Sequence, residues 1–264
     1  METTMEIDLG GRVALVSGAG AGIGAVSAQE FAAAGATVAV VDMNLAAAQA
    51  TVDKIAEAGG TAAAFECNIT SEEQVAATVA AIVERFGSLD CAFNNAGIGP
   101  DGVRIPYGPL VESDAATWRK ICEVNLTGTF LCVKHELIQM MKQGAGSIVN
   151  AASIGGVRMA PGFGAYGPSK AGVIALTELA ALEAAPTGVR VNVVAPGPCG
   201  DTTLMANTLV SDPGQDKMLE EHVIPLKKLA RPIDIARAAI WLCSDLAGHT
   251  TGQRISVDGG MHVA

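Results

Sequence analysis

Residues 12–24, RVALVSGAGAGIG, join a short apolar run rich in β-branched residues to a loop that contains four glycines. The apolar run predicts a buried parallel strand, and the alanine-rich segment 25–34 that follows predicts a helix. This order suits a pyrophosphate, because glycines allow close approach of the backbone and a helix N-terminus offers free N–H groups. The loop therefore predicts a dinucleotide-binding site, although a tight strand-to-helix turn alone is the simpler alternative. The candidate binding residues are Gly18, Gly22, Ile23 and Gly24.

The alternation of apolar runs and amphipathic segments continues to the end of the chain, without a linker or a low-complexity stretch. The predicted strands are 12–17, 37–41, 61–66, 89–93, 147–152, 189–195 and 254–257. The predicted helical segments are 25–34, 45–58, 71–86, 113–141, 166–185 and 233–243. This alternation predicts an α/β fold, a doubly wound parallel sheet of about seven strands with helices on both faces. We expect a single domain over residues 1–264.

The composition argues against several classes of function. The formal net charge is −10 and there is no basic cluster, so we expect neither nucleic acid nor an anionic membrane as a partner. Residues 1–9 lack the features of a secretory signal, and no apolar run approaches the roughly 18 residues of a membrane span. The six cysteines form no CxxC pair and the four histidines have no metal-ligand spacing. We therefore expect reduced thiols, a cytoplasmic location and no metal site.

The second predicted strand ends on Asp42, at the position where a carboxylate can accept hydrogen bonds from both hydroxyls of an adenosine ribose. The same carboxylate would repel a 2′-phosphate. No Arg or Lys lies in the glycine loop or in residues 43–45 to bind such a phosphate. The sequence therefore predicts NAD rather than NADP as the cofactor. The alternative is that Asp42 caps the helix 45–58, and the two roles are compatible.

Three further segments follow predicted strands. Residues 94–97, Asn-Asn-Ala-Gly, are small or polar and would let a cofactor pack against the backbone in the crevice of the sheet. The loop 99–110 is rich in Gly and Pro, and we expect it on the rim of that crevice. Residues 198–225 contain little regular pattern and several helix breakers. A stretch of that length at the end of a strand predicts a substrate lid.

Tyr166 and Lys170 are four residues apart at the start of a predicted helix, so their side chains should share one face. A phenol has an unperturbed pKa of about 10. An ammonium about 4 Å away contributes roughly 4 kcal/mol at an effective dielectric of about 20, which lowers that pKa by about three units. The pair thus predicts a general acid/base that works near neutrality. The alternative is a surface helix that carries one Tyr and one Lys.

The joint order and spacing of these motifs resemble the classical short-chain dehydrogenases/reductases over roughly residues 7–260. The residues that carry the resemblance are Gly18, Gly22, Ile23, Gly24, Asn94, Asn95, Ala96, Gly97, Asn125, Ser153, Tyr166, Lys170, Pro196 and Gly197. The resemblance implies a Rossmann-type sheet of order 3-2-1-4-5-6-7 and reversible hydride transfer between a nicotinamide and a carbonyl or alcohol. It also implies a homotetramer or dimer and no metal in the chemistry.

The resemblance assigns a role to each catalytic candidate. Tyr166 would be the general acid/base, and Lys170 would lower its pKa and bind the nicotinamide ribose. Ser153 would hydrogen-bond the substrate oxygen, and Asn125 would hold a water that links Lys170 to solvent. The simpler alternatives are a strand-end hydroxyl for Ser153 and a helix irregularity for Asn125. The remaining cofactor-binding candidates are Asn68, Ile69, Asn95, Ala96, Gly97, Pro196, Gly197 and Thr202.

The chain departs from the family pattern at three positions. Asn68 stands where the family commonly has Asp, so its contact with the adenine would lack a charge. Asp201 stands where a Thr usually meets the nicotinamide carboxamide, and Thr202 follows it. Either residue could make that contact. Ser17 replaces the usual Thr before the glycine loop and keeps the hydroxyl.

The favoured hypothesis is an NAD-dependent oxidoreductase that acts on a secondary alcohol or its ketone, with a hydrophobic or cyclic substrate. Apolar residues of the lid would form a wall for it, or would simply pack on the core: Leu204, Met205, Leu209, Val210, Met218 and Leu219. One alternative is an NADPH-dependent 3-oxoacyl thioester reductase, against which the lack of a basic residue after Asp42 counts. Another is a non-catalytic NAD-binding regulator, against which the full Ser-Tyr-Lys set counts.

Overall fold

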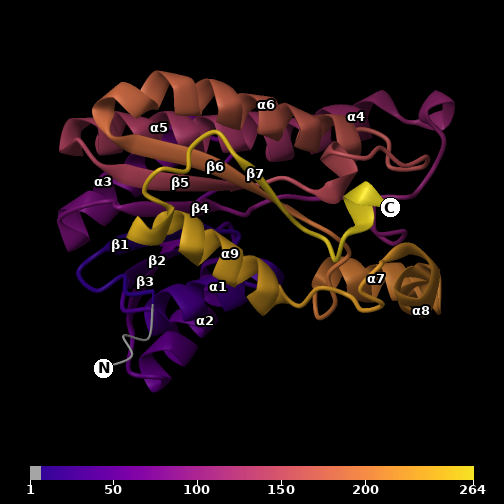
Figure 1. The fold of residues 1–264 in the computed structure, drawn as a ribbon, viewed down its shortest axis with the longest axis horizontal. Coiled ribbons are helices and arrows are strands. Elements are labelled where there is room, and N and C mark those ends of the chain that lie inside the picture. Colours follow the sequence, from indigo (N-terminus) through magenta and orange to yellow (C-terminus); the bar gives the residue numbers. More distant parts are fainter. Residues whose placement is uncertain (1–6) are drawn as a thin grey trace.

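The computed structural model describes residues 7–264, so the first six residues of the predicted domain and of the acidic N-terminal segment lie outside the described part (Figure 1). Its centre is one seven-stranded sheet of order β3-β2-β1-β4-β5-β6-β7, in which every neighbouring pair is parallel. The strands are β1 Val13–Ser17, β2 Thr37–Asp42, β3 Thr61–Glu66, β4 Cys91–Asn94, β5 Gly146–Ala151, β6 Val189–Pro196 and β7 Arg254–Val257. This order confirms the predicted doubly wound fold.

Helices cover both faces of the sheet (Figure 1). They are α1 Gly22–Ala33, α2 Leu45–Glu57, α3 Glu72–Phe86, α4 Ala115–Cys122, α5 Thr129–Gln143, α6 Tyr166–Ala184, α7 Thr203–Ser211, α8 Gln215–Met218 and α9 Pro232–Cys243. Side chains alternate along β1: Ala14 and Val16 pack with α1, α2 and α9, whereas Val13 and Leu15 pack with α3, α5 and α6. The two cores thus lie on opposite faces of one sheet. Within the described residues, no helix combines the length and the apolar character that a membrane crossing requires.

The segment predicted as one helix over 113–141 is divided in two. A π-helical segment, Glu123–Gly128, separates α4 from α5 and contains the buried Asn125. The hydroxyl of Thr129 donates to the backbone carbonyl of Asn125 at 2.8 Å. The disturbance of the helix that the sequence indicated at Asn125 is therefore present.

The expectation of little regular structure over 198–225 is wrong. The segment contains α7, α8 and a π-helical turn, Leu219–Val223. Thr202 is the N-cap of α7, and its hydroxyl accepts a hydrogen bond from the backbone N–H of Met205 at 3.1 Å. Pro213 and Gly214 lie between α7 and α8, so these residues separate two short helices and do not abolish helical structure. In Figure 1, α7 and α8 lie beyond the end of the sheet, beside the C-terminal residues.

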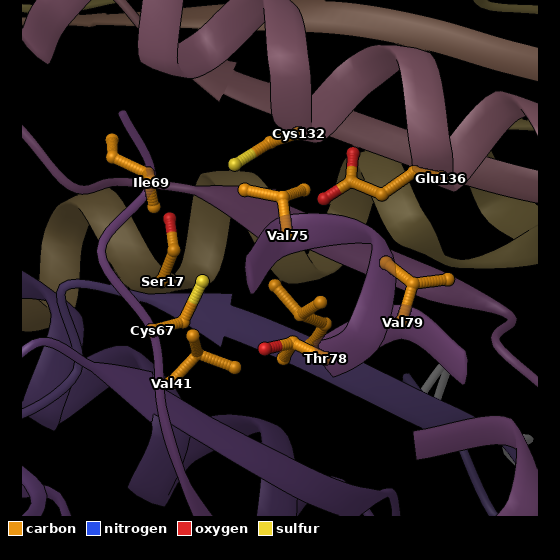
Figure 2. A pocket seen from close by; sticks show the side chains of 10 residues that line it. Ser17, Val41, Cys67, Ile69, Val75, Thr78, Val79, Cys132 and Glu136 are labelled. Carbon is orange, nitrogen blue, oxygen red and sulfur yellow. The ribbon is translucent and has the colours of Figure 1, made fainter. Parts of the chain in front are cut away.

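A buried carboxyl lies between the sheet and α5. Glu136 is fully buried, and its Oε2 accepts a hydrogen bond from Asn94 Nδ2 at 2.8 Å. The same amide donates to Asn150 Oδ1 at 3.0 Å. Neither Glu136 Oε1 nor Asn94 Oδ1 has a partner among the described residues. Figure 2 shows the Glu136 carboxyl beside a small cavity whose other visible neighbours are mostly apolar or sulfur-bearing side chains.

Burial raises the pKa of Glu136 to about 7, against the opposing effect of the Asn94 hydrogen bond. The folded protein therefore binds this proton more tightly than the unfolded chain, whose carboxyl has a pKa of about 4.3. Stability is consequently lost as the pH rises from about 4.3 through 7.

We expect Glu136→Gln, which cannot ionise, to be more stable than the wild type at about pH 8. The difference should be on the order of 1–3 kcal/mol, because the wild type must then hold a buried charge. At about pH 5 the two proteins should differ much less. Thermal unfolding at both pH values checks this, and an equal difference in Tm at both would contradict it.

Candidate active site

The glycine loop connects β1 to α1 and leaves no room for a side chain at Gly18, Gly20 or Gly24. A Cβ on Gly24 would overlap the carbonyl oxygen of Gly18 and come within 2.7 Å of Asn95 Nδ2. Gly18 has φ +64, and a Cβ there would lie 2.8 Å from the Cα of Ala96. The N-cap of α1 is Ala21, which supplies no side-chain oxygen to the first N–H groups of the helix. The loop thus brings the backbone and an open helix N-terminus together, which fits a pyrophosphate.

Asp42 lies against this loop at the carboxyl end of β2. Its Oδ2 accepts from the Gly20 N–H and its Oδ1 accepts from the Asn44 N–H, both at 2.9 Å. The cap of α2 is Asn44, whose Oδ1 accepts from the Ala47 N–H at 3.1 Å. The alternative interpretation of Asp42 as the cap of α2 is therefore wrong. Each carboxylate oxygen keeps a lone pair for a further donor such as a ribose hydroxyl.

The residues after β4 lie at the same edge of the sheet, next to the end of β1. Asn95 Nδ2 donates to the Ser17 carbonyl at 3.2 Å, and the Ala96 N–H donates to the Ser17 hydroxyl at 3.3 Å. These bonds tie the end of β4 to the end of β1. A Cβ on Gly97 would lie 3.1 Å from Asn125 Oδ1 and 3.2 Å from Lys170 Nζ. Gly97 thus lies beside two of the predicted catalytic residues, Asn125 and Lys170.

Asn125 joins three elements through its amide. Its Nδ2 donates to the Ile98 carbonyl at 2.8 Å and to the Ser169 hydroxyl at 3.1 Å, while its Oδ1 accepts from the Ile98 N–H at 2.8 Å. The π-helical segment, the loop after β4 and α6 are therefore held together at one point. The side chain is fully buried, and both ends of its amide are hydrogen-bonded.

Tyr166 and Lys170 share the first turns of α6 beside the end of β5, where Ser153 follows the strand. Lys170 Nζ is buried and donates to the Ala151 carbonyl at 2.8 Å, and burial lowers its pKa to about 8. Burial raises the pKa of the Tyr166 phenol, and a hydrogen bond with Ser153 acts in the opposite direction. The direction is opposite to the one predicted from the spacing, because removal from water is the largest effect on the phenol and the Lys170 ammonium is not among the groups that shift its pKa.

The structure places the remaining predicted residues around this edge. The Cβ of Thr202 lies 3.8 Å from where a Cβ of Gly22 would be, so the start of α7 lies over the glycine loop. Asp201 is exposed and has φ 52. Pro196 ends β6, and the Gly197 N–H donates to the Val257 carbonyl at 2.9 Å.

Asn68 and Ile69 follow β3 at the same edge. Asn68 Oδ1 accepts from the N–H of Thr70 at 3.1 Å and from its hydroxyl at 2.9 Å, so this oxygen is used within the turn. Ile69 is buried against Gly128. Of the predicted apolar lid residues, Met205 and Leu209 line a cleft with Thr202 and Leu229, whereas others such as Val210 are exposed.

The sequence did not indicate four residues at the rim of the site. Tyr107 and Phe163 form an aromatic group with Tyr166, and Asp101 contacts Asn207 on α7. The only sequence signal was the Gly- and Pro-rich loop 99–110, which predicted a rim but no contact across it. Within residues 7–264, no cluster of His, Cys, Asp and Glu has the arrangement of a metal site.

Comparisons with known proteins agree with this geometry. A family model described as enoyl-(acyl carrier protein) reductase matches residues 18–262. The chain is 40% identical to a 2,5-dichloro-2,5-cyclohexadiene-1,4-diol dehydrogenase of Sphingobium indicum, covering 96% of this chain and 98% of that protein. It is 37% identical to a cyclohexanol dehydrogenase of an Acinetobacter strain, covering 98% of each. It is 39% identical to a 3-oxoacyl-(acyl-carrier-protein) reductase of Staphylococcus epidermidis, covering 95% of this chain and 98% of that one.

A solved structure of an NAD⁺-bound xylitol dehydrogenase superposes with a TM-score of 0.88 at 32% identity, covering 95% of this chain and 99% of that one. The sheet order, the glycine loop and the full-length similarity all lead to one conclusion. The chain belongs to the classical short-chain dehydrogenase/reductase family, whose members use a nicotinamide cofactor.

Proposed function

We propose that this protein is an NAD-dependent dehydrogenase that oxidises hydrophobic, cyclic secondary alcohols. One observation carries the proposal: the glycine loop, Asp42 and the group of Ser153, Tyr166 and Lys170 converge on one edge of the sheet. That edge is the crevice in which doubly wound sheets bind dinucleotides. The residues of the crevice fit an NAD molecule, since the loop leaves the backbone open to a pyrophosphate and Asp42 lies where a ribose would bind.

In this proposal Tyr166 is the general base for alcohol oxidation. It takes the hydroxyl proton of the substrate, while a hydride leaves the carbinol carbon and the carbonyl double bond forms. Bound NAD would supply the hydride acceptor. Ser153, which opposes the rise in the pKa of the phenol, orients the substrate oxygen and favours the ionised form of Tyr166.

Lys170 and Asn125 support this step. At neutral pH most Lys170 side chains carry a proton, given a pKa of about 8, so its ammonium can donate to the nicotinamide ribose and contribute positive potential. Asn125 holds the loop after β4 beside that ammonium through its two bonds with Ile98. We assign Asn125 the water link between Lys170 and solvent.

We also assign the contact with the nicotinamide carboxamide to Thr202, since Thr202 lies over the glycine loop and Asp201 is exposed.

Two observations support a cyclic substrate. The names of two relatives that the chain matches along nearly its whole length refer to cyclic alcohols, a cyclohexadienediol and cyclohexanol. In addition, the rings of Tyr107 and Phe163 continue from the ring of Tyr166, and such an apolar wall suits a compact apolar ring. We further propose that residues 198–225 act as the substrate lid.

We propose a homotetramer or dimer in the cytoplasm. Large apolar side chains are exposed on α5 and α6 and would be covered by another copy: Phe130, Ile138, Met141, Leu179 and Leu182. Five of the six free cysteines are buried, which is compatible with a reducing compartment.

The runner-up is an NADPH-dependent 3-oxoacyl thioester reductase, which the similarity to such a reductase favours. The position of Asp42 counts against it, because the carboxylate would face the 2′-phosphate of NADPH. A non-catalytic NAD-binding regulator is the third candidate.

A panel of linear, cyclic, aromatic and steroidal secondary alcohols tests the proposal through the absorbance of NADH. We expect NADH formation, with the highest kcat/KM for cyclic alcohols. Binding of NAD without turnover of any alcohol would favour the regulator. Rapid reduction of a 3-oxoacyl thioester with NADPH would favour the reductase.

We expect Tyr166→Phe to lower kcat by about 10³-fold, because the variant loses the group that moves the proton. The affinity for NAD, measured by fluorescence titration, should change by less than about twofold, since that variant keeps the aromatic ring and removes only the hydroxyl. Turnover at a substantial fraction of the wild-type rate would show that another group is the base.

We expect wild-type kcat/KM to be higher with NAD than with NADP, and Asp42→Asn to lower that ratio by about tenfold or more. The reason is that the variant removes a repulsion worth at least about 1.4 kcal/mol. Asp53→Asn is the matched control, since Asp53 is an exposed carboxylate on α2 that lies outside the proposed ribose site. An unchanged ratio in Asp42→Asn would remove the basis for the NAD preference.

A further inference from the structure

The loop 98–108 is built around a buried carboxylate. The side chain of Asp101 is 0% exposed, and its Oδ1 accepts from the backbone N–H groups of Val103 at 3.1 Å, Arg104 at 2.6 Å and Ile105 at 3.1 Å. Arg104 Nε donates to Oδ2 at 2.7 Å. Burial alone would raise the pKa of Asp101, but these hydrogen bonds and one from Asn207 hold it well below its usual range. The carboxylate is therefore charged at neutral pH.

This loop is also bonded to α7, about one hundred residues later in the chain. Asn207 Nδ2 donates to Asp101 Oδ2 at 2.8 Å, and the Ser211 hydroxyl donates to the Asp101 carbonyl at 3.4 Å. The hydroxyls of Tyr107 and Thr208 hydrogen-bond to each other at 3.0 Å. The Ser211 side chain also packs closely against the backbone of the loop, because a Cβ on Gly102 would overlap it. The loop and α7 thus form one connected rim.

The rim reaches the proposed general base through aromatic rings. The Tyr107 ring meets the Phe163 ring edge to face, with centroids 5.8 Å apart and an interplanar angle of 74°. The Phe163 ring lies 6.3 Å from the Tyr166 ring. The Gly108 N–H donates to the Gly162 carbonyl at 3.1 Å, which fixes the loop to the chain before α6. Tyr107 is still 42% exposed, so this wall has a face open to a ligand.

We propose that Asp101 and Asn207 are positioning residues that set substrate specificity. By tying the loop to α7, they hold the wall of Tyr107 and Phe163 at a fixed place beside Tyr166. A rigid ring substrate can lie against a fixed wall with little loss of its own freedom, whereas a flexible chain loses rotamer entropy on binding there. The fixed wall thus favours cyclic over linear secondary alcohols. This inference rests on the proposed dehydrogenase function.

Asn207→Ala tests the proposal, because it removes the bond from Asn207 to the Asp101 carboxylate and leaves the Asp101–Arg104 contacts within the loop. We expect the ratio of kcat/KM for cyclohexanol to that for 2-hexanol to fall by about tenfold, mainly through a higher KM for cyclohexanol. The KM for NAD should stay within about twofold. Asp212→Ala, in the exposed residue directly after α7, is the control and should keep the wild-type ratio. An unchanged ratio in Asn207→Ala, or an equal fall in the control, overturns the proposal.

A residue swap separates a direct contact from a general structural effect. Asp101→Asn alone should lower the same ratio. The three backbone N–H groups need the oxygen of the new amide, so its NH2 group then faces two donors, Arg104 Nε and Asn207 Nδ2. Combined with Asn207→Asp, the amide on position 101 can donate to the carboxylate on position 207. The double variant should therefore recover part of the lost preference for cyclohexanol over 2-hexanol. A double variant that is no better than the worse single variant would contradict a direct contact.

Hydrogen exchange of the NAD-free protein tests the rim without any substrate. We expect the amides of residues 98–108 to exchange about tenfold faster in Asn207→Ala than in the wild type, with the exchange of the central strands unchanged. Unchanged exchange in the loop overturns the proposal, even for an active enzyme. If the wild type oxidises no alcohol, the proposed function fails, and the exchange result alone still decides whether Asn207 holds the loop.

Discussion

The amide of Asn125 is the interaction on which the arrangement of the site depends. It pairs with both backbone groups of Ile98 and also reaches Ser169 on α6, so one side chain fixes the loop after β4, the break between α4 and α5, and the helix of Tyr166. The break in the helical segment follows from the same residue. A regular helix would present the amide differently, and the π-helical segment lets it point into the site without losing its partners.

Burial and charge oppose each other among the titratable groups of the protein. At Tyr166, Lys170 and Glu136 removal from water dominates: it raises the pKa of the phenol and of the carboxyl, and it lowers the pKa of the amine. At Asp101 the opposite holds, because a guanidinium and several N–H groups surround the carboxylate. The number and direction of the hydrogen-bond donors around a group, and not only its depth of burial, therefore decide whether a buried carboxyl keeps its charge.

Much of the fold could be predicted from the sequence, because parallel strands buried on both faces are short apolar runs. The strands 61–66 and 254–257 were predicted with the bounds that the structure has, and α6 begins at Tyr166 as expected. The helices within residues 198–225 were missed because Pro213 and Gly214 signal only where a helix ends. The predicted fall in the phenol pKa was wrong in direction, since residue spacing carries no information on desolvation.

The contact between Asp101 and Asn207 could not be predicted from the sequence. The two residues lie far apart in the chain, and neither belongs to a recognisable sequence motif. One consequence concerns the exit of ligands. The start of α7 lies over the glycine loop at Thr202, and the middle of α7 is tied to the loop around Asp101. In the proposed function a dinucleotide would bind beside the start of α7, so its release would be coupled to movement of that helix. The lifetime of the contact between α7 and the loop around Asp101 would then limit the rate of turnover.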